Sequence, residues 1–121
     1  MQPRGRAPSH VFRREGDYWT ITYDGRTVRL RDAVGAHYLA RLLARPNQPI
    51  AVGELLETVR GATAVDPERA RSTVSKRIRD VLRRIEAYHP TLGHRLHAGI
   101  KTGASCVYRP DPGDPSTWVT T

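Results

Sequence analysis

The sequence predicts an α+β domain in which a small N-terminal antiparallel sheet precedes three main helices and a C-terminal β-hairpin. Three observations predict it. Alternating residues around a two-residue turn indicate the N-terminal strands, and apolar residues at helical spacing indicate the helices. Two further short strands around a Gly-Ala turn indicate the C-terminal β-hairpin. With 121 residues, the chain is long enough for one domain with a modest core.

The N-terminal sheet is predicted from three strand-like segments. Residues 11–14 form the first, residues 18–23 the second and residues 26–30 the third. Asp24-Gly25 between the last two is a strong hairpin signal, because both residues tolerate the backbone conformations that a two-residue turn requires. One face of the second strand is expected to be buried: Trp19, Ile21 and Tyr23.

Two helices are expected next. Asp32 is predicted to cap the first, and Pro46 ends it because the residue before a proline avoids the helical region. The apolar stripe of this helix consists of Val34, Tyr38, Leu39, Leu42 and Leu43. After a brief strand at residues 50–51, a second short helix is expected from about residue 52 to residue 60.

The third helix, Pro67 to Tyr88, carries most of the information. Asp66 is a good N-cap, and Pro67 fits the first helical position, where its missing N–H costs nothing. One side is an apolar stripe that we expect to be buried: Ala70, Val74, Ile78, Val81, Leu82, Ile85 and Tyr88. The opposite side is almost purely cationic: Ser72, Lys76, Arg79 and Arg83, with Arg69 and Arg77 on the flanks.

The C-terminal hairpin follows a short helical turn expected at residues 91–98. Its strands, Ile100 to Thr102 and Ser105 to Arg109, flank Gly103-Ala104. The sequence therefore predicts a domain over residues 11–109, between a disordered basic arm over residues 1–10 and an extended tail over residues 110–121. Trp118 in this tail is too large to stay in water, so we expect it to dock on the domain or on a partner.

The charge of the chain points to a polyanion as partner. The formal net charge is +8 and the isoelectric point is near 10.5, above the value of about 9 that is typical of nucleic-acid-binding domains. No apolar run approaches the roughly 18 residues that span a bilayer, so no membrane is expected. A single cysteine, Cys106, and the absence of a signal peptide at the start of the sequence predict a cytoplasmic protein, and the expected polyanion partner makes it nucleoid-associated.

The sequence carries no pattern of an active site. It has no Gly-rich phosphate loop, no paired carboxylates in an apolar setting and no nucleophile motif. The one metal-like cluster, His89, His94, His97 and Cys106, matches no zinc spacing. We therefore expect a protein that is not an enzyme and needs no metal or cofactor.

Several segments carry a family likeness: Tyr23-Asp24-Gly25 through Val28-Arg29-Leu30, Tyr38-Leu39 with Leu42-Leu43, Pro46, Glu54-Leu55-Leu56, Val74 with Ile78-Arg79 and Leu82, and Ile100-Lys101-Thr102-Gly103 to Val107-Tyr108. In order and pattern they resemble the OmpR/PhoB-type effector domain, a winged helix–turn–helix with an extra N-terminal sheet. The resemblance covers roughly residues 11 to 109. It implies that the C-terminal hairpin is the wing.

A second set of segments carries a closer likeness: Gly16-Asp17-Tyr18-Trp19-Thr20-Ile21, Val28-Arg29-Leu30-Arg31-Asp32, Gly35, Tyr38-Leu39-Ala40-Arg41-Leu42-Leu43, Glu68-Arg69-Ala70-Arg71, Val74, His89-Pro90, Leu92-Gly93, Ile100-Lys101-Thr102-Gly103 through Cys106, Tyr108 and Pro110-Asp111-Pro112. It is similar to a domain that ends many large actinobacterial regulators of the ATPase and cyclase type. Those relatives usually carry a long Glu/Arg-rich insert between the second and third helices, where this chain has only residues 61–65.

The resemblance implies a sequence-specific, double-stranded DNA-binding transcription regulator. Its third helix would enter the major groove with the N-terminal half nearest the bases. The candidates for base edges are Arg69, Ser72, Thr73 and Lys76. The candidates for phosphate are Arg77, Arg79, Arg83, Arg84, Lys101 and Arg109. Arg4 and Arg6 of the arm either track the minor groove or merely keep the chain in solution.

Two alternatives stay open from the sequence. Most charged helix faces are simply solvated, and Arg outnumbers Lys eighteen to two in this chain, which raises every local count of arginines. The same fold also serves protein–protein contact or dimerisation without DNA, since a fold does not settle a function. We expect a homodimer, with a protein partner as a further possibility, and the free edge of the N-terminal sheet is where a twin chain would pair.

Overall fold

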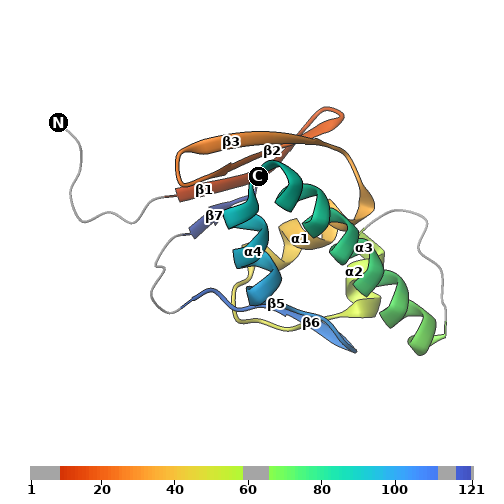
Figure 1. Ribbon diagram of the computed structural model, residues 1–121. Coiled ribbons are helices and arrows are strands. Elements are labelled where there is room, and N and C mark those ends of the chain that lie inside the picture. The colour runs from red at the N-terminus through yellow and green to blue at the C-terminus, as the bar shows by residue number, and fades with distance from the viewer. Residues whose placement is uncertain (1–8, 59–65, 112–116, 121) are drawn as a thin grey trace.

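The structure is a computed structural model that describes residues 9–58, 66–111 and 117–120 (Figure 1). A four-stranded sheet with the order β3-β2-β1-β7 and a three-stranded sheet with the order β4-β6-β5 lie at opposite ends of a group of helices. The expected α+β class and the N-terminal, largely antiparallel sheet are confirmed. The basic arm expected over residues 1–10 lies outside the described residues as far as residue 8, whereas Ser9 and His10 belong to the first strand.

The N-terminal sheet is a meander of β1 (Ser9–Glu15), β2 (Tyr18–Tyr23) and β3 (Arg26–Arg31). Asp24 and Gly25 join β2 to β3 with positive φ angles of 53° and 78°, as a two-residue hairpin turn requires. The inner face of β2 is buried as expected: Trp19, Ile21 and Tyr23.

The C-terminal tail supplies a fourth strand to this sheet, a pairing that the sequence did not reveal. β7 (Thr117–Val119) runs parallel to β1 and places Trp118 opposite His10. The indole ring of Trp118 lies 5.0 Å from the His10 ring and 6.0 Å from the Tyr23 ring, centroid to centroid. Trp118 therefore docks on the body of the domain.

Four helices lie between the two sheets: α1 (Val34–Ala44), α2 (Val52–Thr58), α3 (Pro67–Tyr88) and α4 (Pro90–Gly99). The second sheet is made of β4 (Ile50–Ala51), β5 (Ile100–Lys101) and β6 (Ser105–Tyr108). The segment expected to be a short turn is a complete ten-residue helix, α4. Its start is fixed by Pro90 and by His89, whose Nδ1 accepts a hydrogen bond from the backbone N–H of Leu92 at 3.3 Å.

The apolar stripe of α3 is buried as predicted, with one exception at its end. Six members of the stripe are buried in the core: Ala70, Val74, Ile78, Val81, Leu82 and Ile85. The prediction for Tyr88 is wrong, because its side chain is 56% exposed. Tyr88 is the last residue of α3, and the adjacent His89 takes the buried position instead.

Two glycines allow α3 to pack closely against its neighbours. A Cβ added to Gly35 of α1 would lie 2.2 Å from the backbone oxygen of Arg77. A Cβ added to Gly93 of α4 would lie 2.6 Å from the Cα of Glu86. Since neither position has room for a methyl group, α3 is held between α1 and α4 by backbone-to-backbone contact.

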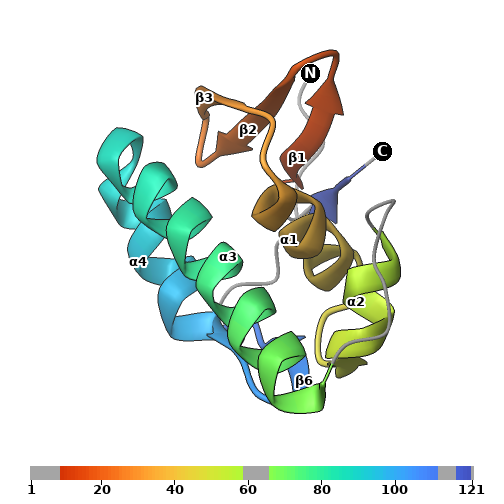
Figure 2. The ribbon, with the colours of Figure 1, turned by 90° about the vertical axis from the view of Figure 1, so that its right-hand side faces the viewer.

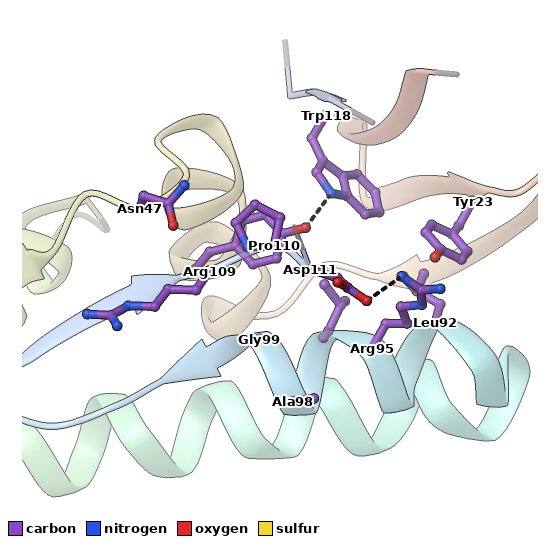
Figure 3. A pocket seen from close by; sticks show the side chains of 12 residues that line it. Tyr23, Asn47, Leu92, Arg95, Ala98, Gly99, Arg109, Pro110, Asp111 and Trp118 are labelled. Carbon is purple, nitrogen blue, oxygen red and sulfur yellow. Dashed lines mark hydrogen bonds and ion pairs between the residues drawn. The ribbon is translucent and has the colours of Figure 1, made fainter. Parts of the chain in front are cut away.

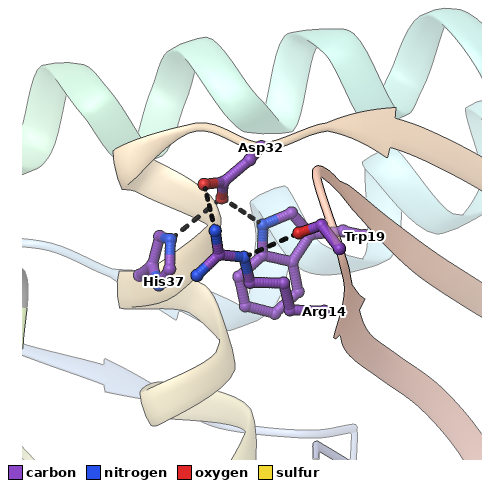
Figure 4. Close-up of polar contacts among 5 residues, drawn as sticks. Arg14, Trp19, Asp32 and His37 are labelled. Atoms are coloured by element: carbon purple, nitrogen blue, oxygen red, sulfur yellow. Dashed lines mark hydrogen bonds and ion pairs between the residues drawn. The ribbon is translucent and has the colours of Figure 1, made fainter.

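The predicted cap of the first helix is wrong. α1 begins at Val34 with Ala33 in the N-cap position, and Asp32 lies one residue earlier. The Asp32 carboxylate accepts a hydrogen bond from Trp19 Nε1 at 2.7 Å and lies 2.9 Å from His37 Nε2 and 3.3 Å from Arg14 Nη2 (Figure 4). These side chains are stronger partners for a carboxylate than the free backbone N–H groups of a helix.

These contacts also set the pKa of Asp32. Partial burial raises this pKa, but the Trp19 hydrogen bond and the charges of His37 and Arg14 together lower it by more, so the pKa lies below its usual value. Asp66, by contrast, occupies the N-cap position of α3 as expected, although its side chain makes no capping hydrogen bond. Pro67 fills the first turn of α3 as predicted.

Candidate nucleic-acid interface

No other element of the described residues covers one long side of α3. α1 and α2 lie along one flank of the helix and α4 along the other, and Figure 2 looks directly onto the open side. With 22 residues, α3 is about 33 Å long. The turn of 100° per residue brings five residues to this side, which we call the outward face of α3: Arg69, Ser72, Lys76, Arg79 and Arg83. All five are exposed.

The outward face carries unneutralised positive charge. Among the described residues, Arg69, Lys76 and Arg79 take part in no ion pair. Two of the three acids of α3 pair with other arginines of the helix: Glu68 lies 3.5 Å from Arg71, and Asp80 binds Arg83, which is thus the paired cation of the outward face. Three exposed cations without an ion-pair partner among the described residues therefore lie on the open side of one helix, where they attract anions.

The structure separates three predicted contact residues from the outward face. Arg77 lies on the flank that faces α1, where its Nη1 donates a hydrogen bond to the hydroxyl of the fully buried Tyr38 at 3.2 Å. Arg84 is seven residues further on and therefore shares this flank. Thr73 is half-buried between this flank and the outward face. Arg77 thus helps to fasten α3 to α1 rather than lying beside Arg79, as the sequence had suggested.

The β5–β6 hairpin lies next to the N-terminal half of α3 (Figure 2). The hydroxyl groups of Ser75 and Thr102 are 3.2 Å apart and link the helix to the hairpin loop. An open polar hollow lies between the two elements, which we call the hairpin hollow; its lining is Glu68, Arg71, Ser72, Ser75, Arg79, Thr102 and Gly103. Sequence reasoning missed the contact between Ser75 and Thr102. These residues are 27 positions apart in the sequence, and only the tertiary fold brings them together.

The two predicted cations of the hairpin occupy different places. Lys101 is exposed on β5, directly before the loop that meets α3. Arg109 is exposed at the base of the hairpin, where its backbone N–H donates to the carbonyl of Gly99. Lys101 therefore lies closer along the hairpin to the α3 contact than Arg109 does.

A second hollow follows along the same flank of α3, between α3 and α4, and we call it the α3–α4 hollow. Its lining from α3 is Arg79, Leu82, Arg83 and Glu86, and its lining from α4 is Gly93, His94, His97 and Ala98. Arg79 borders both hollows. His94 and His97 are both exposed, and their spacing of three residues places them on one side of α4.

A larger hollow of about 510 Å³ lies on another part of the surface, between α4, the end of β6 and the N-terminal sheet (Figure 3). Its walls are mainly apolar, and Trp118 Nε1 donates a hydrogen bond to the Tyr108 hydroxyl at 3.3 Å. Its charged groups offset each other, since Arg95 lies 3.9 Å from Asp111, while the guanidinium of Arg109 points away from it. It therefore lacks the cationic excess of the outward face.

The metal-like cluster of the sequence is dispersed. His89 caps α4, and Cys106 is fully buried in β6, where burial raises the pKa of its thiol. Within the described ranges, no three His, Cys, Asp or Glu residues are grouped so as to hold a metal ion.

The comparisons with known proteins give no relative. No family model matches the chain, and no curated protein or solved structure is significantly similar to it. In the part of the chain that the structure describes, no helix has the length and apolar character needed to cross a membrane. The candidate interface therefore rests on the geometry and charge described above.

Proposed function

We propose that this chain is a winged helix–turn–helix domain that binds double-stranded DNA and regulates transcription. α3 would be the recognition helix and the β5–β6 hairpin the wing. The observation that carries the proposal is the outward face of α3, where Arg69, Lys76 and Arg79 are exposed and take part in no ion pair of the described residues. DNA supplies the dense negative charge that such a face attracts.

The size of α3 and its surroundings support the same proposal. A major groove about 12 Å wide admits one helix, whose diameter with side chains is about 10–12 Å. The N-terminal half of α3 is the half beside the hairpin, so it can enter a groove while the hairpin meets the adjacent backbone or minor groove (Figure 2).

The contact residues follow from this placement. Arg69, Ser72 and Lys76 are the candidates for base edges, and the half-buried Thr73 has the least reach of the predicted set. Arg79, Arg83, Lys101 and Arg109 are the candidates for phosphate. Arg77 and Arg84 lie on the flank of α3 that faces α1. They would contact phosphate only where the DNA backbone passes beside α1.

Pairing of two chains is part of the proposal. β3 and β7 are the two edges of the N-terminal sheet, and Val119 on β7 is 39% exposed. An exposed edge can pair with a second chain, and two DNA-binding domains related by symmetry read two half-sites. The alternative function, protein–protein contact or dimerisation without DNA, uses the same edges and leaves the outward face of α3 without a role.

A charge-reversal experiment separates these functions. We expect Lys76→Glu/Arg79→Glu to weaken duplex binding at least about 100-fold, because two cations that face the DNA become anions, and the lost phosphate contact of Arg79 should lower the salt slope by about 0.9. Arg29→Glu/Arg31→Glu makes the same change in net charge at two exposed positions of β3 and is the control; its fold and self-association are measured alongside, because Arg29 lies near Glu15 and β3 is a proposed pairing edge. Fluorescence anisotropy over a salt series measures both. Equal losses in the two variants, or unchanged binding alongside persistent self-association, would contradict the proposal.

A further inference from the structure

The α3–α4 hollow has no role in the proposed contacts of the N-terminal half of α3. It measures about 340 Å³ and lies where the C-terminal half of α3 meets α4. Arg79 and Arg83 border it from α3, and His94 and His97 border it from α4. Leu82, Gly93 and Ala98 form its apolar part, so four groups able to carry positive charge and one carboxylate, that of Glu86, surround a small hollow.

The width of the helix pair determines what this hollow can meet. Packed helices lie about 8–10 Å apart, so α3 and α4 together are about 20 Å wide. A major groove about 12 Å wide cannot accept both. If α3 occupies the groove, α4 lies over the groove rim, which is a sugar–phosphate backbone. The hollow then opens toward phosphate rather than toward bases.

We propose that the α3–α4 hollow is a phosphodiester-binding site in which His94 and His97 clamp the DNA backbone and make duplex affinity depend on pH. The inference rests on the proposed DNA binding. It adds α4 to the interface and assigns the two histidines a function. The occupant is one backbone phosphate of the duplex.

The charges around the histidines give this dependence its sign. The charged side chains of α3 that line the hollow with His94 and His97 are Arg79, Arg83 and Glu86. Arg83 is partly offset by Asp80. A phosphate entering the hollow brings negative charge next to both imidazoles. The bound state therefore takes up protons, and affinity rises as pH falls through the histidine range.

The test compares the full chain with two double variants in duplex binding between about pH 8 and about pH 6, at constant ionic strength. For the unaltered protein we expect affinity to rise about tenfold over this range, with an uptake of up to two protons per site. His94→Gln/His97→Gln should bind more weakly at pH 6 and lose most of the pH dependence. His94→Arg/His97→Arg should also lose it but bind tightly throughout, because arginine stays charged.

Isothermal titration calorimetry in buffers of different ionisation enthalpy measures the proton uptake directly. If the unaltered protein binds duplex DNA and the Gln pair keeps the full pH dependence, the clamp is wrong and the DNA-binding proposal stands. If no duplex binds at any pH, both proposals fail. Circular dichroism of each variant excludes loss of the fold, which is expected to be intact since both histidines are exposed.

Discussion

Two parts of the described chain, residues 9–58 and residues 66–111, differ in how many of their charged side chains form ion pairs. Residues 9–58 contain seven arginines and six acids, and most of these side chains are paired with one another. Asp32 binds Arg14 and His37, Glu15 lies near Arg13 and Arg29, and Glu54 lies near Arg41 and Arg45. Residues 66–111 contain ten basic residues and five acids, and the outward face of α3 keeps Arg69, Lys76 and Arg79 outside any ion pair of the described residues.

This difference separates a scaffold from a binding surface. Charges that are paired within the domain contribute to its stability and leave little field outside it, whereas unpaired charges of one sign create a field that a partner can neutralise. α3 contributes to both the scaffold and the binding surface, because one of its sides packs against α1 and the other is open. Substitutions in the scaffold should therefore change the free energy of unfolding, and substitutions on the open side should change binding.

The largest expected effect is at the packed side of α3. Gly35→Ala places a methyl group 2.2 Å from the backbone oxygen of Arg77, so α1 and α3 must move apart. We expect a loss of about 3 kcal/mol in the free energy of unfolding, measured by chemical denaturation. Gly53→Ala is the control, since nothing lies within 4 Å of its added Cβ and alanine is the better helix former. A Gly35→Ala protein as stable as the parent would show that the helices are not in close contact.

The second prediction concerns the charged pairs of the scaffold. Asp32→Asn removes the charge that His37 and Arg14 contact and should reduce the free energy of unfolding by about 2 kcal/mol near neutral pH. Because the pKa of Asp32 is lowered in the folded state, its stabilisation is present above the ordinary carboxyl pKa and is lost as pH falls through the folded value. The difference between parent and variant should therefore shrink toward low pH. Asp24→Asn in the exposed turn between β2 and β3 is the control and should show no such trend.

Local sequence patterns predicted most of the scaffold. The Asp24-Gly25 turn and the stripe of α3 depend on residues that are neighbours in sequence, so period and turn chemistry were sufficient. The contacts of Asp32 were not predictable in this way, because Trp19 is thirteen residues distant and only the fold brings the two together. The pairing of β7 with β1 joins the two ends of the described chain and has no local signal at all.

The sequence predicted which side of α3 is exposed and cationic, but not the contacts that surround it. Helical periodicity correctly predicted that Lys76 and Arg79 are exposed on one side of α3. It did not show that Arg77 bonds to Tyr38, that Ser75 meets Thr102, or that α4 is long enough to form a hollow with α3. Each of these depends on which neighbour covers which flank of α3, and that is a tertiary property. His89-Pro90, an N-cap followed by a proline, was the available sign of α4.

The third prediction tests the open side of α3. Lys76→Ala should leave the free energy of unfolding within about 0.5 kcal/mol of the parent, because the side chain is exposed and in no ion pair of the described residues. It should weaken binding to a selected genomic site about tenfold and binding to a scrambled duplex much less. Arg83→Ala should instead weaken both duplexes alike, as a phosphate contact does. Competition binding distinguishes the two, and identical behaviour of the variants would remove the division between base and phosphate contacts.

The smallest expected effect is a gain in affinity. Asp80→Asn removes the acid that binds Arg83 on α3, so Arg83 loses its ion-pair partner. Because exposed ion pairs contribute little to stability, the free energy of unfolding should change by less than about 1 kcal/mol. Affinity should rise about two- to threefold, equally for selected and scrambled duplexes and most clearly at low salt, where phosphate attraction is least screened.

Glu54→Gln is the matched control for this gain. It makes the same change in net charge among paired residues of the scaffold, beside Arg41 and Arg45, away from the outward face of α3. If binding depends on unpaired charge at α3 rather than on total charge, only Asp80→Asn strengthens it. An equal gain in both variants would mean that the overall positive charge, and not the arrangement on one helix, attracts the duplex, and the distinction between scaffold and binding surface would fail.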